Sequence, residues 1–316
     1  MTSNTTTSHL PAMGVVGLGT MGFSIAACFL TRRHPTIAIA TNENELTTTT
    51  TRMREYLQKL GCAENIDLLQ VSDDYTSLAN CEIVTESVAE NADIKRQVIA
   101  KIEAAVTDKA LIASNTSALP ITQLQQNAKH PERVLGMHWA LPAPQSKLLE
   151  VICGEQTSSE SADRAIEWAK RWDKETALVR KDVPGFVGNR IMYAMIREAC
   201  HLVDSGVATP EDVDAILKHD IGSWIGFGVL FQYIDLTRGK LNATVMESLF
   251  PHLCRSRELP DVMKKLQEEN AGGTANGHGF FDYTPEEAKE LDEKFLEYSV
   301  EAGKLTQKYF SIKNKQ

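Results

Sequence analysis

The sequence of 316 residues has no long apolar run, no paired cysteine motif and no excess of basic charge. None of its apolar runs reaches the roughly 20 residues that a membrane-spanning helix needs. The six cysteines include no Cys-x-x-Cys pair and no metal-ligand spacing, which predicts free thiols in a reducing compartment and no metal site. The formal net charge of −9 argues against nonspecific binding of nucleic acid, which requires a basic surface.

The first twelve residues, MTSNTTTSHLPA, lack the charged and apolar regions of a signal peptide, and we expect them to form a flexible tail. The whole chain has the composition of an ordinary globular protein, with 42% hydrophobic and 24% charged residues. Its length predicts two domains. Together these observations favour a cytoplasmic enzyme with neither a membrane nor a nucleic-acid partner.

A glycine motif near the start of the chain is the strongest functional signal. The apolar run 13–16 leads into a Gly-x-Gly-x-x-Gly spacing, and a helix-like apolar pattern follows. This strand, turn and helix context is typical of a dinucleotide-binding site, in which the helix N-terminus holds the phosphates. The motif therefore predicts a cofactor site that includes Gly17, Gly19, Thr20, Met21 and Gly22.

Predicted strands and helices alternate up to about residue 180, which favours an α/β fold. We predict a doubly wound, Rossmann-type sheet domain over residues 1–182, followed by an all-helical C-terminal domain over residues 183–316. The first helix of the second domain is predicted over 186–203 and is expected to be largely buried. Further strands are predicted at 36–40, 66–71, 81–85, 110–113, 134–137, 148–153 and 176–179, and helices at 43–60, 92–106 and 160–172.

A metal-free dehydrogenase needs a base for the hydroxyl proton, a partner that orients the base, and polar groups near the reacting oxygen. His138 ends a predicted strand, at the sheet edge where ligands bind in this architecture. A proline-rich loop returns the chain to the next strand, which can bring Glu150 beside His138. The Ser-Asn-Thr-Ser segment at 114–117 follows another strand. Each signal is weak alone, because a single histidine is more often structural and such a segment is usually a capping turn.

The chain resembles the 3-hydroxyacyl-CoA dehydrogenases over nearly its whole length. The glycine motif is followed by Glu-Ser-Val-x-Glu-Asn at 86–91 with Lys95, and by Ala-Ser-Asn-Thr-Ser at 113–117. The remaining matches, in chain order, are Gly136-x-His138, Lys147-Leu148-x-Glu150-Val151-Ile152, Asp182-x-Pro184-Gly185-Phe186-Val187-x-Asn189-Arg190 and Gly277-x-Gly279-Phe280-x-x-Tyr283.

The resemblance implies an NAD-dependent oxidoreductase of fatty acid metabolism that forms a homodimer through its helical domain. It implies that His138 is the general base and that Glu150 orients it. It also implies that Ser117 and Asn189 contact the reacting region of a small-molecule substrate, which can be a CoA thioester. Along the cofactor site it places Glu86, Glu90, Lys95 and Asn115.

The sequence departs from the family where the second strand ends. An acidic residue normally binds the adenosine ribose there, but this chain has Thr41 or Asn42, with Glu43 just beyond. We assign Asn42 and Glu43 to the cofactor site. Because no Arg or Lys follows closely enough to receive a 2′-phosphate, NAD is favoured over NADP.

Three further departures concern the substrate. Leu141 stands where the family usually has asparagine, which removes a polar contact near the reacting oxygen. The span 43–65 is too short for the helical hairpin that helps to hold CoA in many mitochondrial-type members, although Arg52, Arg54 and Lys59 either meet an anionic substrate or form a solvated helix face. The segment Trp-Ile-Gly-Phe-Gly at 224–228 makes the expected pocket wall more aromatic.

These departures leave three readings. The first is NAD-dependent oxidation of a 3-hydroxyacyl-CoA to the 3-oxo product, with the His138–Glu150 pair as general base. The second keeps this chemistry but acts on a free hydroxy acid or an aryl aldehyde or alcohol, because 137–139 and 181–187 are similar to a side branch that oxidises a substituted pyridine carboxylate. The third is a non-catalytic, crystallin-like nucleotide-binding protein.

Overall fold

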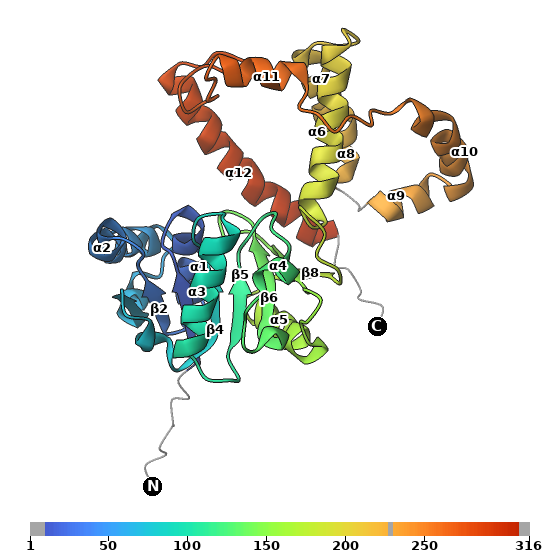
Figure 1. The fold of residues 1–316 in the computed structure, drawn as a ribbon. Helices are drawn as coiled ribbons and strands as arrows, with labels where there is room; N and C mark the ends of the chain where they lie inside the picture. The colour runs from blue at the N-terminus through green and yellow to red at the C-terminus, as the bar shows by residue number, and fades with distance from the viewer. Residues whose placement is uncertain (1–9, 227–229, 310–316) are drawn as a thin grey trace. The chain divides into compact units, whose positions relative to one another are not determined.

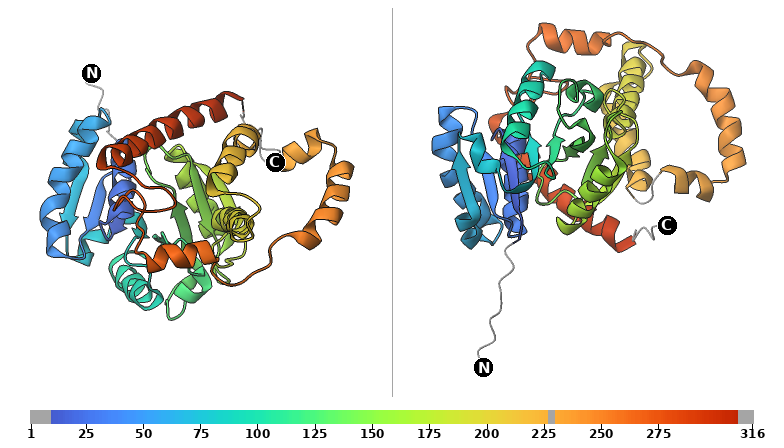
Figure 2. Two further views of the ribbon diagram at one scale, coloured as in Figure 1. Left: turned by 90° about the horizontal axis from the view of Figure 1, so that it is seen from above. Right: turned by 60° about the horizontal axis from the view of Figure 1, so that its bottom comes forward.

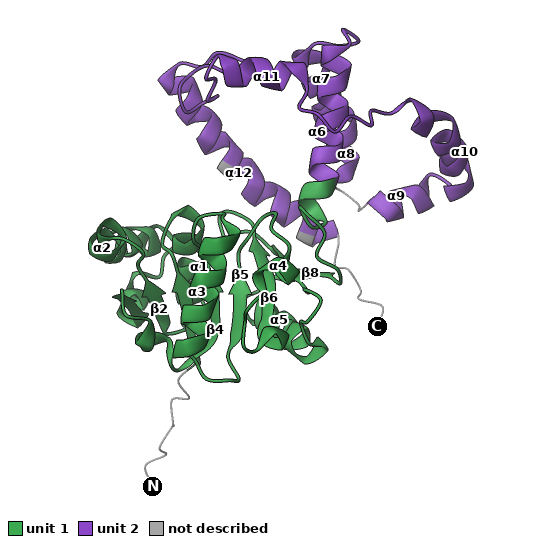
Figure 3. Cartoon of the chain, in the orientation of Figure 1, with its two compact units in different colours: residues 1–190 green, residues 191–316 purple. Residues whose placement is uncertain are grey.

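The computed structural model describes residues 10–226 and 230–309 (Figure 1). The chain divides between Arg190 and Ile191 into two compact units (Figure 3). This division lies a short way beyond the boundary predicted after residue 182. The predicted flexible tail is outside the described residues up to residue 9, and so are Phe227 and Gly228 of the predicted aromatic wall.

The first unit contains one sheet with the strand order β3-β2-β1-β4-β5-β6-β7-β8. The first six strands in this order are parallel, β7 is antiparallel to β6, and β8 is parallel to β7. The chain order reverses between β1 and β4, which defines the crevice where doubly wound sheets bind ligands. The strands are β1 (Ala12–Val16), β2 (Thr36–Ile39), β3 (Leu69–Ser72), β4 (Cys81–Glu86), β5 (Leu111–Ser114), β6 (Val134–Trp139), β7 (Leu148–Ile152) and β8 (Glu175–Val179).

Helices cover both faces of this sheet (Figures 1 and 2). One apolar core packs the sheet against α1, α2 and α5, and the other packs it against α3 and α4. The predicted doubly wound Rossmann-type domain is thereby confirmed. Its helices are α1 (Thr20–Thr31), α2 (Glu43–Lys59), α3 (Ala92–Ala105), α4 (Ile121–Leu124) and α5 (Ser159–Arg171), with short 3-10 helices η1 (Ala63–Leu68), η2 (Tyr75–Leu78) and η3 (Pro131–Arg133).

In two places, side chains form hydrogen bonds with backbone carbonyls. The threonine run at 47–51 lies within α2, and the hydroxyls of Thr47 and Thr48 there donate to carbonyls one turn back. The strand predicted over 66–71 is wrong at its start, since η1 continues to Leu68 and β3 begins at Leu69. Asn65 anchors η1 by donating from its buried amide to the Leu30 carbonyl at 2.9 Å.

The second unit is helical, and its described residues contain only isolated β-bridges at Gly273, His278 and Asp282 instead of strands. Thr209 caps α7 and Pro210 occupies its first turn, as is typical of a helix start. The elements are α6 (Gly188–Asp204), which begins in the first unit, α7 (Pro210–Ile216), the π-helix η4 (Leu217–Ile221), α8 (Gly222–Ile225), α9 (Leu230–Leu236), α10 (Gly239–Leu249), η5 (Phe250–His252), α11 (Asp261–Glu268) and α12 (Pro285–Tyr309).

The prediction that the first helix of this unit is largely buried is wrong. Of the residues in α6, only Cys200 is buried. The helix is amphipathic rather than apolar on all sides, and its apolar face is exposed at Ile191, Met192, Tyr193, Met195 and Ile196. Three-and-four spacing identifies such a face but does not show what covers it.

Candidate active site

His138 and Glu150 face each other across the antiparallel pair β6–β7. The strand register places the two residues directly opposite one another. His138 Nδ1 lies 2.8 Å from Glu150 Oε2, and the side chains are 20% and 4% exposed, respectively. Residues opposite one another in an antiparallel pair share a face of the sheet, so the backbone ladder itself brings the two groups together.

The start of α6 keeps the Glu150 carboxylate charged. Glu150 Oε1 accepts hydrogen bonds from the backbone N–H groups of Val187, at 3.3 Å, and Gly188, at 3.1 Å. Burial alone would raise the pKa of Glu150, but the hydrogen bonds from His138 and from these N–H groups outweigh it and hold the pKa below its ordinary value. Glu150 therefore remains an ionised acceptor for the imidazole at neutral pH.

The other two predicted catalytic residues lie in contact beside this pair. The Asn189 amide donates to the backbone carbonyl of Ser117 at 2.8 Å. Asn189 follows directly on Gly188, whose N–H contacts Glu150, so α6 joins the four predicted residues into one connected set. The Ser117 side chain is exposed on the loop that follows β5.

Asn115 links the carboxyl ends of three neighbouring strands. Its Oδ1 accepts the backbone N–H of Trp139 at 3.0 Å, next to His138, and its Nδ2 donates to Ser87 Oγ at 3.3 Å. The amide is therefore fixed at the edge of the sheet and is hydrogen-bonded to the residue that follows His138.

Glu86, Glu90 and Lys95 form an ionic network at the same edge. The ammonium group of Lys95, which is 1% exposed, lies 2.8 Å from Glu86 Oε1 and 3.3 Å from Glu90 Oε2. Glu90 Oε1 also accepts from the Thr116 hydroxyl and from the backbone N–H of Ser117. Burial would raise the pKa of Glu90, but these hydrogen bonds and Lys95 lower it overall. The network fixes the loop that carries Asn115 and Ser117.

The three motif glycines differ in what an added Cβ would meet. Gly17 has φ +87°, and a Cβ there would lie 2.8 Å from the Ser87 carbonyl oxygen. A Cβ at Gly22 would lie 1.8 Å from the Gly17 carbonyl oxygen, so α1 and the turn can pack only around glycine. A Cβ at Gly19 would meet nothing within 4 Å.

The open space at Gly19 is what a bound pyrophosphate requires. No protein atom demands glycine there, yet the position immediately precedes Thr20 and Met21 at the start of α1. No side chain caps this helix, and its first turn contains no acidic residue, so its N–H groups are available to an anion. These residues fit a dinucleotide cofactor.

Asn42 and Glu43, the two residues assigned to the cofactor site after the second strand, differ in their hydrogen bonds. Asn42 caps α2 by accepting the Glu45 N–H at 2.9 Å. The Glu43 carboxylate makes no hydrogen bond within the described part of the chain. Glu45, which sequence analysis did not identify, folds its carboxylate back to Thr41 at the end of β2. The spacing Asn42-x-x-Glu45 resembles that of a capping box, and this is the sequence signal that could have identified such a return.

The residues that fasten the loop between β6 and β7 gave no signal in the sequence. The backbone N–H of Ala143 donates to Ser24 Oγ on α1 at 2.8 Å. Lys174, which is 5% exposed, donates to the carbonyls of Ala143 and Ser146, and burial lowers its pKa. In the sequence Lys174 is indistinguishable from a solvated charge, because only the fold reveals the carbonyls around it.

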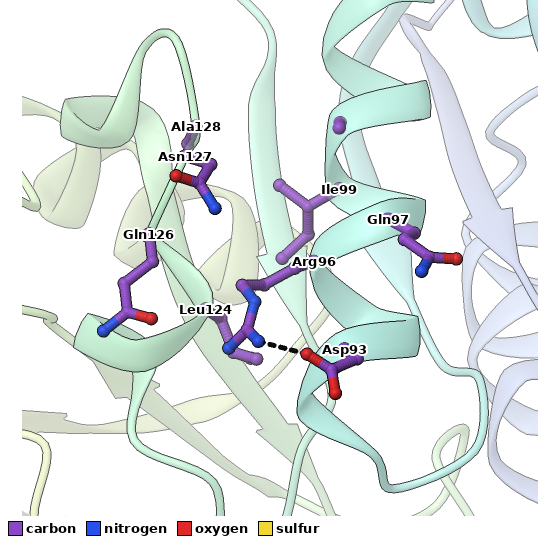
Figure 4. Close-up of a pocket in the computed structure, with 9 residues that line it drawn as sticks. Asp93, Arg96, Gln97, Ile99, Leu124, Gln126, Asn127 and Ala128 are labelled. Carbon is purple, nitrogen blue, oxygen red and sulfur yellow. Dashed lines mark hydrogen bonds and ion pairs between the residues drawn. The ribbon is translucent and has the colours of Figure 1, made fainter.

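A surface pocket between α3 and α4 lies apart from these groups (Figure 4). It is lined by residues that include Arg96, Leu124 and Gln126, and the Arg96 guanidinium is paired with Asp93. None of the predicted site residues lines it. Within residues 10–226 and 230–309, no group of three or more His, Cys, Asp or Glu side chains is arranged to hold a metal ion.

The fold, the glycine turn and the polar edge of the sheet define an NAD-binding oxidoreductase. Comparison with protein families is consistent with this class: the NAD-binding domain of 3-hydroxyacyl-CoA dehydrogenase matches residues 12–183, and the C-terminal domain of the same family matches residues 185–283. The chain belongs to the 3-hydroxyacyl-CoA dehydrogenase family.

Two kinds of relative are similar to the chain. The 5-formyl-3-hydroxy-2-methylpyridine 4-carboxylate 5-dehydrogenase of Mesorhizobium japonicum is 32% identical, over 88% of this chain and 93% of its own length. A probable 3-hydroxybutyryl-CoA dehydrogenase of Deinococcus radiodurans is 35% identical, over 68% of this chain and 76% of its own length.

Solved structures show the same two kinds. A pyridine-carboxylate 5-dehydrogenase, described as an NAD+ dependent dismutase, superposes with a TM-score of 0.86 at 29% identity, covering 94% of this chain and 99% of its own. The (S)-3-hydroxybutyryl-CoA dehydrogenase of Ralstonia eutropha superposes with a TM-score of 0.73 at 26% identity, covering 87% of this chain and 99% of its own.

In the described part of the chain, no helix combines the length and apolar character needed to cross a membrane.

Proposed function

We propose that this chain oxidises a hydroxyl-bearing carbon of a small substrate, with His138 as the general base and Glu150 as its orienting partner. The observation that carries the proposal is the 2.8 Å contact between the His138 imidazole, near the end of β6, and the buried, charged carboxylate of Glu150 on β7. The pairing of His138 with a buried carboxylate argues against a non-catalytic protein, because the stability of the sheet does not require this pair.

The carboxylate determines which imidazole nitrogen can act as the base. Ionised Glu150 is only an acceptor, so the proton of neutral His138 lies on Nδ1 and donates to it. Nε2 then has its lone pair free to take the hydroxyl proton. The imidazolium that forms is stabilised by the adjacent negative charge.

The remaining residues position the two reactants. NAD, when bound, accepts the hydride that leaves the carbon as His138 takes the proton. We assign Ser117 and Asn189 to the substrate's reacting region, since they border the His138–Glu150 pair. Asn115, held beside Trp139, is assigned to the nicotinamide end of the cofactor site, and Glu90 and Lys95 support that site by fixing the loop at 115–118.

Two substrate classes fit this chemistry. A 3-hydroxyacyl-CoA thioester, oxidised to the 3-oxo compound, is the class that the family's name indicates. The second class is a free hydroxy acid, an aryl alcohol, or an aryl aldehyde that has added water to form a hydrate, whose carbon carries the hydroxyl that the step requires. It is favoured by the apolar, 54% exposed Leu141 close in sequence to His138, and by the closer structural likeness to the pyridine-carboxylate enzyme.

Substrate-dependent formation of NADH separates these possibilities. We would compare 3-hydroxybutyryl-CoA, free 3-hydroxybutyrate and an aryl alcohol, using the wild type, His138→Gln and the control His130→Gln. His130 is a surface histidine that also contacts a glutamate, Glu132, at 3.3 Å. Loss of turnover in His138→Gln alone is expected. Equal activity of both variants would overturn the proposed base, and activity only with free substrates would exclude the CoA thioester.

We also propose a cytoplasmic homodimer, with residues 1–182 binding the cofactor and residues 183–316 serving substrate binding and dimerisation. Among the described residues beyond 190, only Cys200 is buried, so this unit has no apolar core of its own. Its exposed apolar side chains need a cover, and a second copy supplies an identical apolar surface. The free state of all six cysteines agrees with a reducing compartment. Sedimentation of a monomer at micromolar concentration would exclude the dimer.

A further inference from the structure

The end of β2 lacks the acidic side chain that usually binds a dinucleotide's ribose. In dinucleotide-binding sheets a carboxylate about 20 residues after the glycine turn accepts the hydroxyls of the adenosine ribose. Here β2 ends at Ile39, Ala40 is apolar and 7% exposed, and the polar Thr41 follows. The sequence therefore leaves open which group performs this task.

The two residues predicted from the sequence are poorly suited to it. The Asn42 side chain is already used as the cap of α2, where its Oδ1 accepts the Glu45 N–H. Glu43 is exposed in the first turn of α2, and its carboxylate has no hydrogen bond to fix it among the described residues. An unanchored carboxylate loses side-chain entropy on binding a ligand.

Glu45 instead brings a carboxylate to the end of the strand. Its Oε2 accepts the backbone N–H of Thr41 at 2.7 Å and the Thr41 hydroxyl at 2.9 Å. These two bonds fix the group just beyond the end of β2, and Glu45 is partly buried. No described residue occupies its other oxygen, Oε1, which can accept from a ligand hydroxyl.

We propose that Glu45 is the ribose-binding and cofactor-selecting residue of this chain. Its carboxylate accepts hydrogen bonds from the adenosine ribose hydroxyls of NAD and repels the 2′-phosphate of NADP. The carboxylate is thus supplied from one turn inside α2 rather than from the strand, and Thr41 holds it in place. This assignment rests on the dinucleotide site and is independent of the substrate.

Equilibrium binding of NADH and NADPH, followed by nicotinamide fluorescence without substrate, tests the assignment. Glu45→Gln keeps an oxygen that can accept from Thr41 but removes the charge. We expect its affinity for NADH to fall about tenfold or more, as is typical when a hydrogen bond to a charged group is lost. Glu55→Gln, which neutralises another exposed glutamate of α2, is the charge-matched control and should bind like the wild type.

Two additional variants make the result decisive. Glu43→Gln tests the competing residue, and a loss of affinity there but not in Glu45→Gln would overturn the proposal. Glu45→Arg should bind NADPH more tightly than the wild type does, because an arginine can receive the 2′-phosphate. If Glu45→Gln binds NADH as the wild type does while its thermal unfolding temperature falls, Glu45 is a helix cap only and the proposal fails.

Discussion

Replacing Glu150 with glutamine removes the charge beside the proposed base and the acceptor that fixes its tautomer. The side-chain volume and the acceptor for the N–H groups of Val187 and Gly188 are retained, while the negative charge is removed. The lost charge-assisted bond to His138 is worth about 1.5–3 kcal/mol, or about 10- to 100-fold in rate. The glutamine amide can also donate to Nδ1, which would place the imidazole proton on Nε2 and block its action as a base.

A wrong tautomer has a larger effect than the lost charge. The corresponding Asp→Asn change in a serine protease triad lowers kcat about 10⁴-fold. We therefore expect Glu150→Gln to lower kcat by about 10²- to 10⁴-fold with little change in KM, because the effect arises in the transition state. Steady-state kinetics of NADH formation gives both constants.

The matched control removes a different His–Glu contact. Glu132→Gln acts on the exposed contact with His130 and should leave kcat unchanged. Unaltered NADH binding by Glu150→Gln would show that the cofactor site is intact. A Glu150→Gln enzyme with kcat within about threefold of the wild type would refute the role assigned to the carboxylate.

Three further outcomes are expected. Gly22→Ala should fail to fold or lose much of its thermal stability, since its Cβ overlaps the Gly17 carbonyl. Gly19→Ala should melt like the wild type but bind NADH more weakly. The reasoning is contradicted if the two variants show the same change in thermal stability and the same change in NADH affinity. Lys174→Met leaves the Ala143 and Ser146 carbonyls without their donor and should destabilise the chain by about 1–3 kcal/mol in urea unfolding; unchanged stability would show that these bonds contribute nothing net. Because the folded-state pKa of Glu150 is lowered, its stabilising contribution is present above the ordinary pKa of 4.5 and is lost as pH falls through the folded value. The difference in unfolding free energy between the wild type and Glu150→Gln should therefore shrink in that acid range. A difference that grows there would contradict the lowered pKa.

The strand and helix pattern of the first unit could be predicted because its signals are local. Buried parallel strands appear as short apolar runs, and β4, β5 and β6 lie within a few residues of their predicted positions. The strand over 66–71 was misplaced because its apolar residues occur in η1 as well as in β3. Periodicity alone cannot separate such short segments.

The site could be predicted only in part, for a physical reason. His138 and Glu150 lie on strands whose register follows from a single loop, so their contact could be anticipated from chain direction. Lys174 acts through a side chain that reaches backbone carbonyls brought together only by the tertiary structure. Glu45 makes a local contact with Thr41, four residues back, which its spacing from Asn42 could have signalled. Lys95 is enclosed by Glu86 and Glu90, although a lysine in the first turn of a helix is ordinarily a solvated charge.

The reversal of strand direction between β6 and β7 has a consequence for how such enzymes diversify. Side chains alternate between the two faces of a sheet, so a shift of one residue in pairing would send His138 and Glu150 to opposite sides. The intervening segment, 140–147, is free of that constraint as long as both strands keep their alignment. Substitutions there can alter the loop beside His138, while the proposed base and its partner remain paired on the ladder.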